Sequence, residues 1–216
     1  GQLIALDGLT GTLLWDFKPA INPTLFYPKT RNFIGSPSLI DINKDTINDI
    51  MIGNRNGLFY CINGKDGSIL WKHRSSIPSG ILSSPFIKQN YIYYTESYGY
   101  IHKLSIKGRY IDSYNINQIQ YPHITATPIV NNKNTLIIGS TNQDDKSGFW
   151  SLIPRKPQQF TPIGNSSATA LLANVDNSKD PEFIIVSESG WLYILGPYGK
   201  IKGKFKLLTG TECTPL

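Results

Sequence analysis

The residues best suited to chemistry lie in one acidic loop, residues 41–49 (DINKDTIND). Oxygen-bearing side chains stand at its first, third, fifth and ninth positions, and short apolar segments flank it on both sides. Ca2+ takes about six to eight oxygen ligands, and alternate acidic residues in a tight loop bring such ligands toward one point. The spacing predicts a calcium site formed by the side chains of Asp41, Asn43, Asp45 and Asp49 and the backbone carbonyl of Ile47.

A second loop, residues 174–182 (NVDNSKDPE), repeats these offsets with weaker oxygen donors. Its candidate ligands are Asn174, Asp176, Ser178 and Glu182, and we predict a weaker calcium site there. For both loops an alternative needs no metal, because Asp and Asn side chains accept hydrogen bonds from nearby backbone amides and stabilise turns by themselves. The sequence leaves both interpretations open.

The other chemistry-bearing residues are dispersed. His73, His102 and His123 show no paired ligand spacing, and Cys61 and Cys213 lie far apart. Two such cysteines fit neither a zinc module nor a disulfide scaffold. No glycine-rich phosphate loop precedes a helical pattern, and no nucleophile elbow occurs. The sequence does not exclude a Ser-His-Asp triad. We therefore expect no catalytic site.

The composition indicates which elements position these loops. The 216 residues include 19 Gly and 14 Pro, which disfavour helix interiors and predict short strands and turns. The net charge of +6 is scattered rather than clustered, so we expect no nucleic-acid partner. No apolar run approaches the ~18 residues of a membrane span, so any membrane association is expected only through segments outside this sequence.

Two sequence markers recur with a period of about 45 residues, which is typical of propeller blades. The first is a glycine followed by bulky residues, with a turn glycine nine or ten residues later in most copies. The second is a group of small residues before a short apolar segment. The turn glycines are Gly11, Gly67, Gly108 and Gly199, and the small-residue groups begin at Ser36, Ser83, Thr125, Ser167 and Thr214.

Each repeat holds four short apolar segments, which predicts an all-β β-propeller of four-stranded antiparallel blades. We expect about 4.5 blades in a single propeller domain over residues 1–216, as a fragment of a longer chain. The approximate repeats are 1–35, 36–82, 83–124, 125–166 and 167–213. Residues 1–17 would form two outer strands, and residues 214–216 one inner strand. An all-β sandwich with glycine turns is the alternative.

The first repeat resembles the tryptophan-docking motif of quinoprotein (PQQ-like) propeller repeats, A-x-D-x-x-T-G-x-x-x-W. The matching residues are Ala5, Asp7, Thr10, Gly11 and Trp15 in the first repeat and Gly67 and Trp71 in the second. The later repeats lose the tryptophan. The resemblance implies that Trp15 and Trp71 pack against neighbouring blades and have a structural role. Trp150 and Trp191 lie at another strand position, where protein contact and packing between blades are both open.

The acidic loop resembles the calcium-binding FG-GAP loops of integrin-type propellers, D-x-[DN]-x-D-G-x-x-D. Thr46 stands where that pattern has glycine, and threonine disfavours a positive φ. Calcium is accordingly the one cofactor that we expect.

The resemblance implies a non-catalytic scaffold or recognition propeller with a protein partner. Its compartment would be extracytoplasmic, meaning a periplasm, a secretory lumen or a cell surface. We expect no PQQ, because the quinone-dependent enzymes of this family use an adjacent Cys-Cys pair that this sequence lacks. The alternatives are a fragment of a PQQ-dependent dehydrogenase and a calcium-dependent adhesion propeller.

Overall fold

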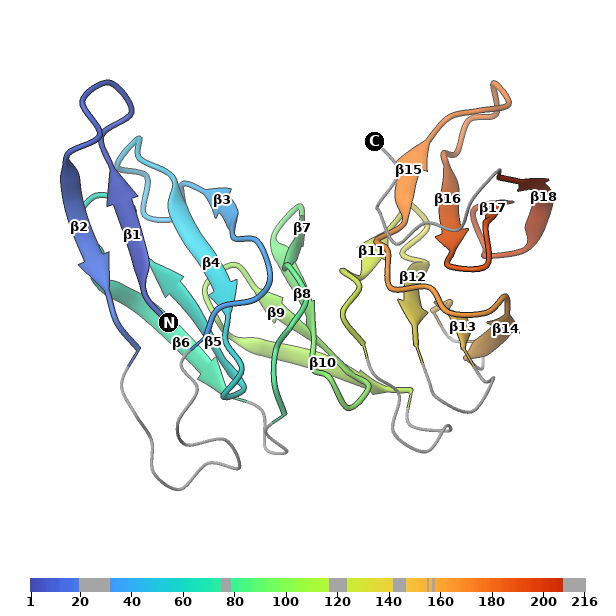
Figure 1. The fold of residues 1–216 in the computed structure, drawn as a ribbon, viewed down its shortest axis with the longest axis horizontal. Helices are drawn as coiled ribbons and strands as arrows, with labels where there is room; N and C mark the ends of the chain where they lie inside the picture. Colours follow the sequence, from blue (N-terminus) through green and yellow to red (C-terminus); the bar gives the residue numbers. More distant parts are fainter. Residues whose placement is uncertain are drawn as a thin grey trace. The chain divides into compact units, whose positions relative to one another are not determined.

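The computed structural model describes residues 1–19, 32–74, 79–116, 124–141, 147–154, 156 and 158–207. All regular elements in these ranges are β-strands (Figure 1), so the prediction of an all-β chain is confirmed. Within these ranges there is no helix of the length and apolarity that crossing a bilayer requires. The inner strand predicted at residues 214–216 lies outside the described residues, as do His123 and Cys213.

The strands form one two-stranded sheet and four four-stranded sheets, in which strands adjacent in sequence are adjacent in the sheet. The two-stranded sheet pairs β1 (Leu3–Leu6) with β2 (Leu13–Phe17), antiparallel. The second sheet contains β3 (Ser38–Ile40), β4 (Asp49–Gly53), β5 (Leu58–Ile62) and β6 (Ile69–Arg74). The third contains β7 (Phe86–Lys88), β8 (Tyr91–Thr95), β9 (Tyr100–Ser105) and β10 (Tyr110–Asn115).

The fourth sheet contains β11 (Ile129–Val130), β12 (Leu136–Ser140), β13 (Gly148–Leu152) and β14 (Gln159–Pro162). The fifth contains β15 (Leu171–Ala173), β16 (Glu182–Ser187), β17 (Trp191–Leu195) and β18 (Ile201–Lys206). Each four-stranded sheet lies within one predicted repeat, although the repeat boundaries themselves stay predictions.

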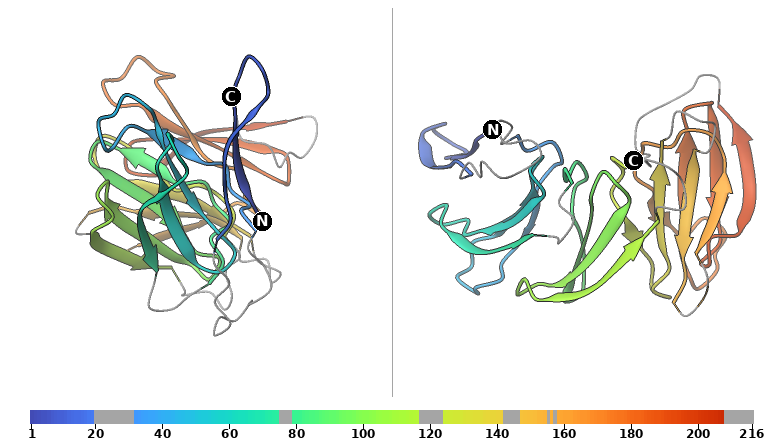
Figure 2. Two further views of the ribbon diagram at one scale, coloured as in Figure 1. Left: turned by 90° about the vertical axis from the view of Figure 1, so that its left-hand side faces the viewer. Right: turned by 90° about the horizontal axis from the view of Figure 1, so that it is seen from below.

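The chain forms two compact units. The first comprises residues 1–96 and 102–113 and holds sheets β1–β2 and β3–β6 with most of β7–β10. The second comprises residues 97–101 and 114–216 and holds sheets β11–β14 and β15–β18. Figure 2 shows that the sheets are twisted ribbons, as expected for L-amino-acid strands.

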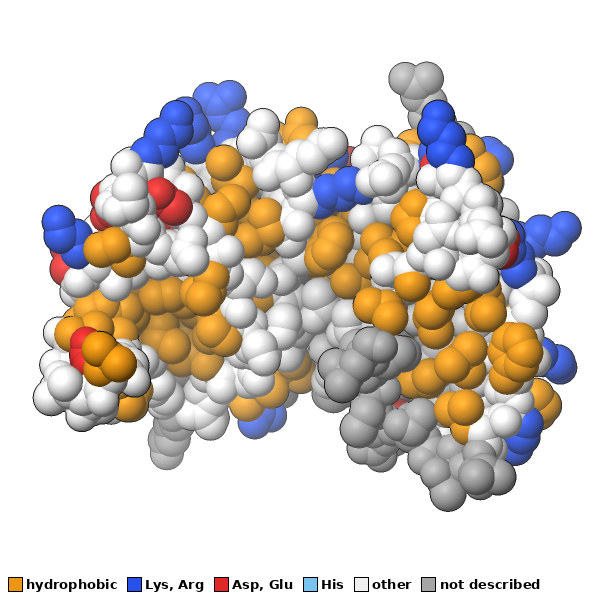
Figure 3. Space-filling view, turned by 90° about the horizontal axis from the view of Figure 1, so that it is seen from above, with side chains coloured by type: hydrophobic (Ala, Val, Ile, Leu, Met, Phe, Trp, Pro, Cys, Tyr) orange, Lys and Arg blue, Asp and Glu red, His pale blue; other side chains and the backbone are white. Residues whose placement is uncertain are grey.

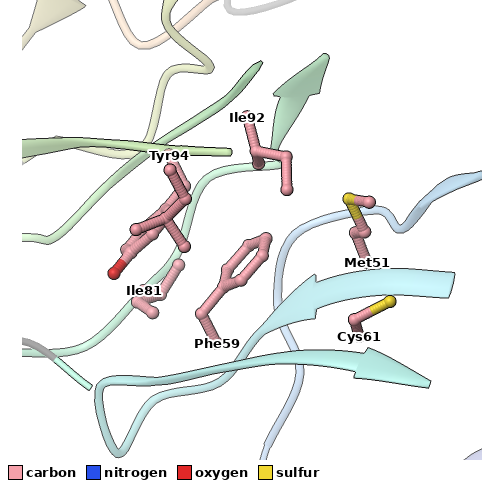
Figure 4. Packing of buried hydrophobic residues seen from close by; sticks show 7 residues of the cluster. Met51, Phe59, Cys61, Ile81, Ile92 and Tyr94 are labelled. Atoms are coloured by element: carbon pink, nitrogen blue, oxygen red, sulfur yellow. The ribbon is translucent and has the colours of Figure 1, made fainter. Parts of the chain in front are cut away.

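The core of the first unit packs aromatic rings from neighbouring sheets (Figure 4). The Phe59 ring stacks on Tyr94 with centroids 4.5 Å apart and planes 9° from parallel. Cys61 lies fully buried in this cluster. Burial, and then the nearby Asp49 carboxylate, raise the pKa of the Cys61 thiol to about 12, so it stays a thiol at neutral pH. The cluster contains Met51, Phe59, Cys61, Ile81, Ile92, Tyr94 and Leu104.

Trp15 joins sheet β1–β2 to sheet β3–β6. Its Nε1–H donates to the Gly64 carbonyl at 2.8 Å, and its ring lies on the turn at Gly67. A Cβ on Gly67 would lie 2.8 Å from Trp15 Cε3, and Gly67 has a φ of +74°. Only glycine fits both the left-handed backbone and the close indole. Trp15 and Phe17 pack there against Ile52, Tyr60 and Ile62.

The tryptophans outside the docking motif differ from each other. Trp150 is buried and packs on Phe160, with ring centroids 4.9 Å apart, so packing is the role that the structure gives it. Trp191 is half-buried, and the amines of Lys204 and Lys206 lie 5.1 and 4.9 Å from its ring centroid. These distances are in the range of cation–π interactions.

Candidate functional site

The acidic loop connects β3 to β4 and curls around the carboxylate of its first residue, Asp41. Asp41 Oδ1 accepts hydrogen bonds from the backbone amides of Lys44 at 2.7 Å and Asp45 at 3.2 Å. Its Oδ2 accepts a third bond, from the amide of Thr46 at 3.0 Å. These amides all point at one anion, which is the geometry that stabilises a tight Asx-containing loop.

The last residue of the loop, Asp49, is fully buried at the start of β4. Its Oδ2 accepts from the backbone amide of Ile42 at 2.9 Å, and from that of Asn43 at 3.3 Å. Its Oδ1 accepts from the backbone amide of Gly64 at 3.2 Å. Asp49 therefore ties both ends of the loop to the turn that follows β5.

Asp45 completes the set of carboxylates. Its Oδ1 accepts from the backbone amide of Ile47 at 2.9 Å, and its Oδ2 from the side-chain amide of Asn43 at 3.0 Å. Every carboxylate oxygen of Asp41, Asp45 and Asp49 thus accepts at least one hydrogen bond. In the described part of the chain no group of three or more His, Cys, Asp or Glu side chains is placed to hold a metal ion. A calcium ion here would share its oxygens with backbone amides.

Two residues of the loop have left-handed backbone conformations, Lys44 with φ +64° and Thr46 with φ +74°. Threonine in this region costs on the order of 1–2 kcal/mol because its Cβ crowds the following carbonyl. The sequence suggested that Thr46 would resist this conformation. The hydrogen bond from the Thr46 amide to Asp41 helps to hold it.

The second loop, between β15 and β16, binds a lysine amine that comes from strand β18 of the same sheet. The Lys202 amine lies 2.6 Å from Asp176 Oδ2 and 2.6 Å from Glu182 Oε1. Hydrogen bonding to this amine is the first cause that lowers the pKa of Asp176 to about 2, and it lowers the pKa of Glu182 in the same way. Glu182 is fully buried, and it also accepts a hydrogen bond from the backbone amide of Val175. Asp49 accepts the corresponding bond from the backbone amide of Ile42.

The two loops differ in whether the last strand of their sheet supplies a lysine amine. Ile69 pairs with Ile62, and Ile201 pairs with Leu195, in the matching strands of their sheets. The residue after Ile69 is Leu70, whereas the residue after Ile201 is Lys202. Strand β6 therefore has no amine at the position from which β18 supplies one.

A buried acid–base cluster lies in the first unit and was not predicted. The Glu96 carboxylate and the His102 ring are almost fully buried, with Oε1 and Nε2 3.3 Å apart. Ser79 donates to Glu96 Oε2 through its amide and its hydroxyl, at 3.3 and 3.2 Å. His73 Nδ1 lies 2.8 Å from the Tyr94 hydroxyl.

The surroundings of this cluster disfavour charge on two of its members, His73 and Tyr94. Burial, and then His102, lower the pKa of His73. Burial, and then the Glu96 carboxylate, raise the pKa of Tyr94. Both groups are therefore neutral at pH 7, and the arrangement is a buried hydrogen-bonded network rather than an exposed base beside a nucleophile.

A basic groove of about 680 Å³ lies on the third sheet, where the β7–β8 and β9–β10 turns meet. No salt bridge within the described residues engages Lys103, Lys107 or Arg109. The Lys103 amine stands 4.1 Å from the centroid of the Tyr91 ring. Cations beside apolar walls can hold an anionic group attached to an apolar body. The groove is lined by Asn90, Tyr91, Ser105, Ile106, Lys107, Arg109 and Ile111.

The sequence matches no protein-family model and no curated protein. Solved structures do resemble the chain. BamB from Moraxella catarrhalis has a TM-score of 0.59 and 14% identity, over 99% of this chain and 72% of that chain. A europium-containing methanol dehydrogenase has a TM-score of 0.65 and 12% identity, over 95% of this chain and 47% of that chain. The chain thus spans about half the length of that dehydrogenase. These likenesses show the fold, a β-propeller of PQQ-like repeats.

Proposed function

We propose that this chain is a non-catalytic, extracytoplasmic interaction propeller, whose groove on sheet β7–β10 binds an acidic segment of a partner protein. The observation that carries the proposal is the set of cations in that groove. Lys107 and Arg109 line it beside Ile106 and Ile111, and none of the described acidic side chains forms an ion pair with either cation. An acidic peptide with apolar residues complements both features.

The form of the groove favours a peptide over a small substrate. It lies across two hairpin turns of one sheet, and a short extended segment can span such a surface. Figure 3 shows that Lys and Arg side chains are scattered over the face it displays, which favours local recognition over one broad polyanion-binding surface. The enzyme alternative uses a pair of adjacent cysteines at the quinone. Cys61 is buried and has no cysteine next to it, so this sequence lacks that pair.

The test measures the binding of short synthetic peptides by fluorescence anisotropy. We expect acidic peptides that contain Leu and Tyr to bind, and to bind more weakly as salt rises. The double substitution Lys107→Glu with Arg109→Glu should weaken binding roughly tenfold or more. The matched double substitution Lys65→Glu with Lys200→Glu, in two other exposed turns, should leave binding unchanged.

Two results would overturn this proposal. One is equal binding by the groove variant and its control. The other is stronger binding of single-stranded oligothymidine than of the acidic peptides, which would make the groove a nucleic-acid site.

We further propose calcium at the acidic loop, because three aspartates lie in that loop and strand β6 has Leu70 at the position from which β18 supplies the Lys202 amine. Calcium at about one hundred times its dissociation constant should add about 2.7 kcal/mol to the stability, seen as a melting temperature a few degrees above that in chelator. Asp45→Asn should abolish this difference. Asp176→Asn should preserve it, because Lys202 already neutralises the second loop. Identical melting with calcium and chelator would establish the loop as a self-sufficient turn.

A further inference from the structure

The hydrogen bond between His73 and Tyr94 depends on the charge of the imidazole. His73 Nδ1 lies 2.8 Å from the Tyr94 hydroxyl, and Tyr94 is fully buried. A neutral imidazole can accept a hydrogen bond from this hydroxyl at Nδ1, whereas an imidazolium can only donate there. Protonation of His73 therefore makes the hydroxyl an acceptor and removes the one acceptor that the described structure gives its hydrogen.

The rings that face His73 in the described part of the chain carry no negative charge at neutral pH. Tyr94 of β8, His102 of β9 and Tyr110 of β10 have ring centroids 6.3, 6.0 and 6.2 Å from that of His73. No described carboxylate forms an ion pair with His73. Both oxygens of the Glu96 carboxylate in this cluster are already engaged, one of them with His102. Charging His73 thus adds a positive charge without a partner to a largely buried cluster.

Two other sheets show that the fold itself does not require ionisable groups at these places. In sheets β3–β6, β7–β10 and β15–β18 a glycine with φ of +70°, +88° or +82° lies in the turn between the second and third strands. Of these three sheets, only β7–β10 places groups on both sides of the turn that change charge at or below neutral pH. The buried residues three before and three after the glycine are Asn54 and Tyr60 in β3–β6, Glu96 and His102 in β7–β10, and Ser187 and Tyr193 in β15–β18.

We propose that the cluster of His73, Tyr94, Glu96 and His102 makes the junction between sheets β3–β6 and β7–β10 acid-sensitive, so that a fall in pH from 7.0 to 5.5 loosens it. His73 comes from β6, whereas the rings that it contacts come from β8, β9 and β10. A charge on His73 therefore acts where the two sheets meet. This pH response does not depend on peptide binding at the basic groove.

The direction of the response follows from the pKa of His73. Burial, and then His102, lower this pKa below its ordinary value of 6.5. As the pH falls, the unfolded chain therefore takes up the proton before the folded chain does. The contribution of His73 to stability is full above pH 6.5 and is lost as the pH falls toward the pKa of the folded state.

The experiment measures the melting temperature by circular dichroism at pH 7.0 and 5.5, in chelator and at constant ionic strength. Wild-type chain should melt roughly 2–4 °C lower at pH 5.5. His73→Gln, which keeps an oxygen that can accept from the Tyr94 hydroxyl, should lose most of this shift. The matched control His123→Gln also removes one of the three histidines and should keep the whole shift.

A second variant tests the cluster if His73→Gln does not fold. Glu96→Asn combined with His102→Tyr gives β7–β10 the neutral pair that β3–β6 holds at the same positions. Because His102 helps to lower the pKa of His73, the shift in melting temperature should be smaller in this double variant than in wild type.

Nuclear magnetic resonance follows the same proton directly. The ring signal that disappears in His73→Gln, or that remains after the other histidines are replaced, should titrate below pH 6.5 in the folded wild-type chain. Equal melting temperatures of wild type at pH 7.0 and 5.5 would overturn the proposal, as would a full shift in folded His73→Gln. Loss of the shift in His123→Gln would also overturn it, because the response would then arise outside this cluster.

Discussion

Replacing Trp15 by alanine should lower the free energy of unfolding by about 3–5 kcal/mol, the range for truncating a large buried aromatic residue. The ring is buried against Ile52, Tyr60 and Ile62 of the next sheet, and it covers Gly67. Alanine would leave a cavity beside a glycine whose backbone cannot move to fill it. Urea unfolding followed by circular dichroism measures the change.

Two further variants separate the parts of this effect. Trp15→Phe keeps an aromatic ring but loses the Nε1–H bond to the Gly64 carbonyl, so we expect a smaller loss than for alanine. Leu13→Ala, in the same strand but exposed, should change stability by less than about 0.5 kcal/mol. If Trp15→Ala costs no more than Leu13→Ala, the indole is not what joins the two sheets.

The fold could be predicted because its signals are local. A turn with φ of +74° at Gly67, or +77° at Gly108, requires glycine at one position, and the repeats therefore show it at a regular spacing. Short apolar segments between such turns then predict the strands. The structure confirms the all-β propeller of PQQ-like repeats on this basis.

The acidic loops could be predicted only in part. The offsets predicted which residues share a loop, since Asp41, Asp45 and Asp49 are close in sequence. They could not predict that an amide reaches every carboxylate oxygen, from the backbone in each case except that of Asp45 Oδ2, because this depends on the left-handed conformations of Lys44 and Thr46. Lys202 is distant in sequence from Asp176, and only the register of β17 with β18 brings its amine to the second loop.

The buried cluster of Glu96, His102, His73 and Tyr94 leaves no sequence pattern. His73 comes from β6, Tyr94 from β8 and His102 from β9, so their meeting depends on how two sheets pack. The one signal in the sequence was the presence of ionisable residues within apolar strands. Ionisable residues within apolar strands are rarely buried unless they meet partners.

Replacing Asp49 by alanine should lower the free energy of unfolding by about 3 kcal/mol. The carboxylate is fully buried and accepts from the amides of Ile42, Asn43 and Gly64. A fully buried N–H that loses its acceptor costs about 1–3 kcal/mol, and the exposure of Asn43 lets water recover part of that cost. Unfolding in chelator measures this effect without any contribution from calcium.

Asp49→Asn keeps one oxygen acceptor, so its cost should lie between those of wild type and alanine. Asp112→Ala, which removes an exposed carboxylate that accepts from the neighbouring Ser113 amide, should cost less than about 1 kcal/mol. Equal costs for Asp49→Ala and Asp112→Ala would mean that the amides around Asp49 find water as readily as they find the carboxylate.

Asp49 and Trp15 should also depend on each other, because both bind Gly64. Asp49 Oδ1 accepts from the Gly64 amide, and the Gly64 carbonyl accepts from Trp15 Nε1. A double-mutant cycle with Asp49→Asn and Trp15→Phe should give a coupling energy of about 0.5–3 kcal/mol, whereas Asp49→Asn with Leu13→Ala should be additive. Coupling confined to the first pair means that the acidic loop holds the turn on which the indole docks. The carboxylate would then stabilise the joint between two sheets whether or not a metal ion binds.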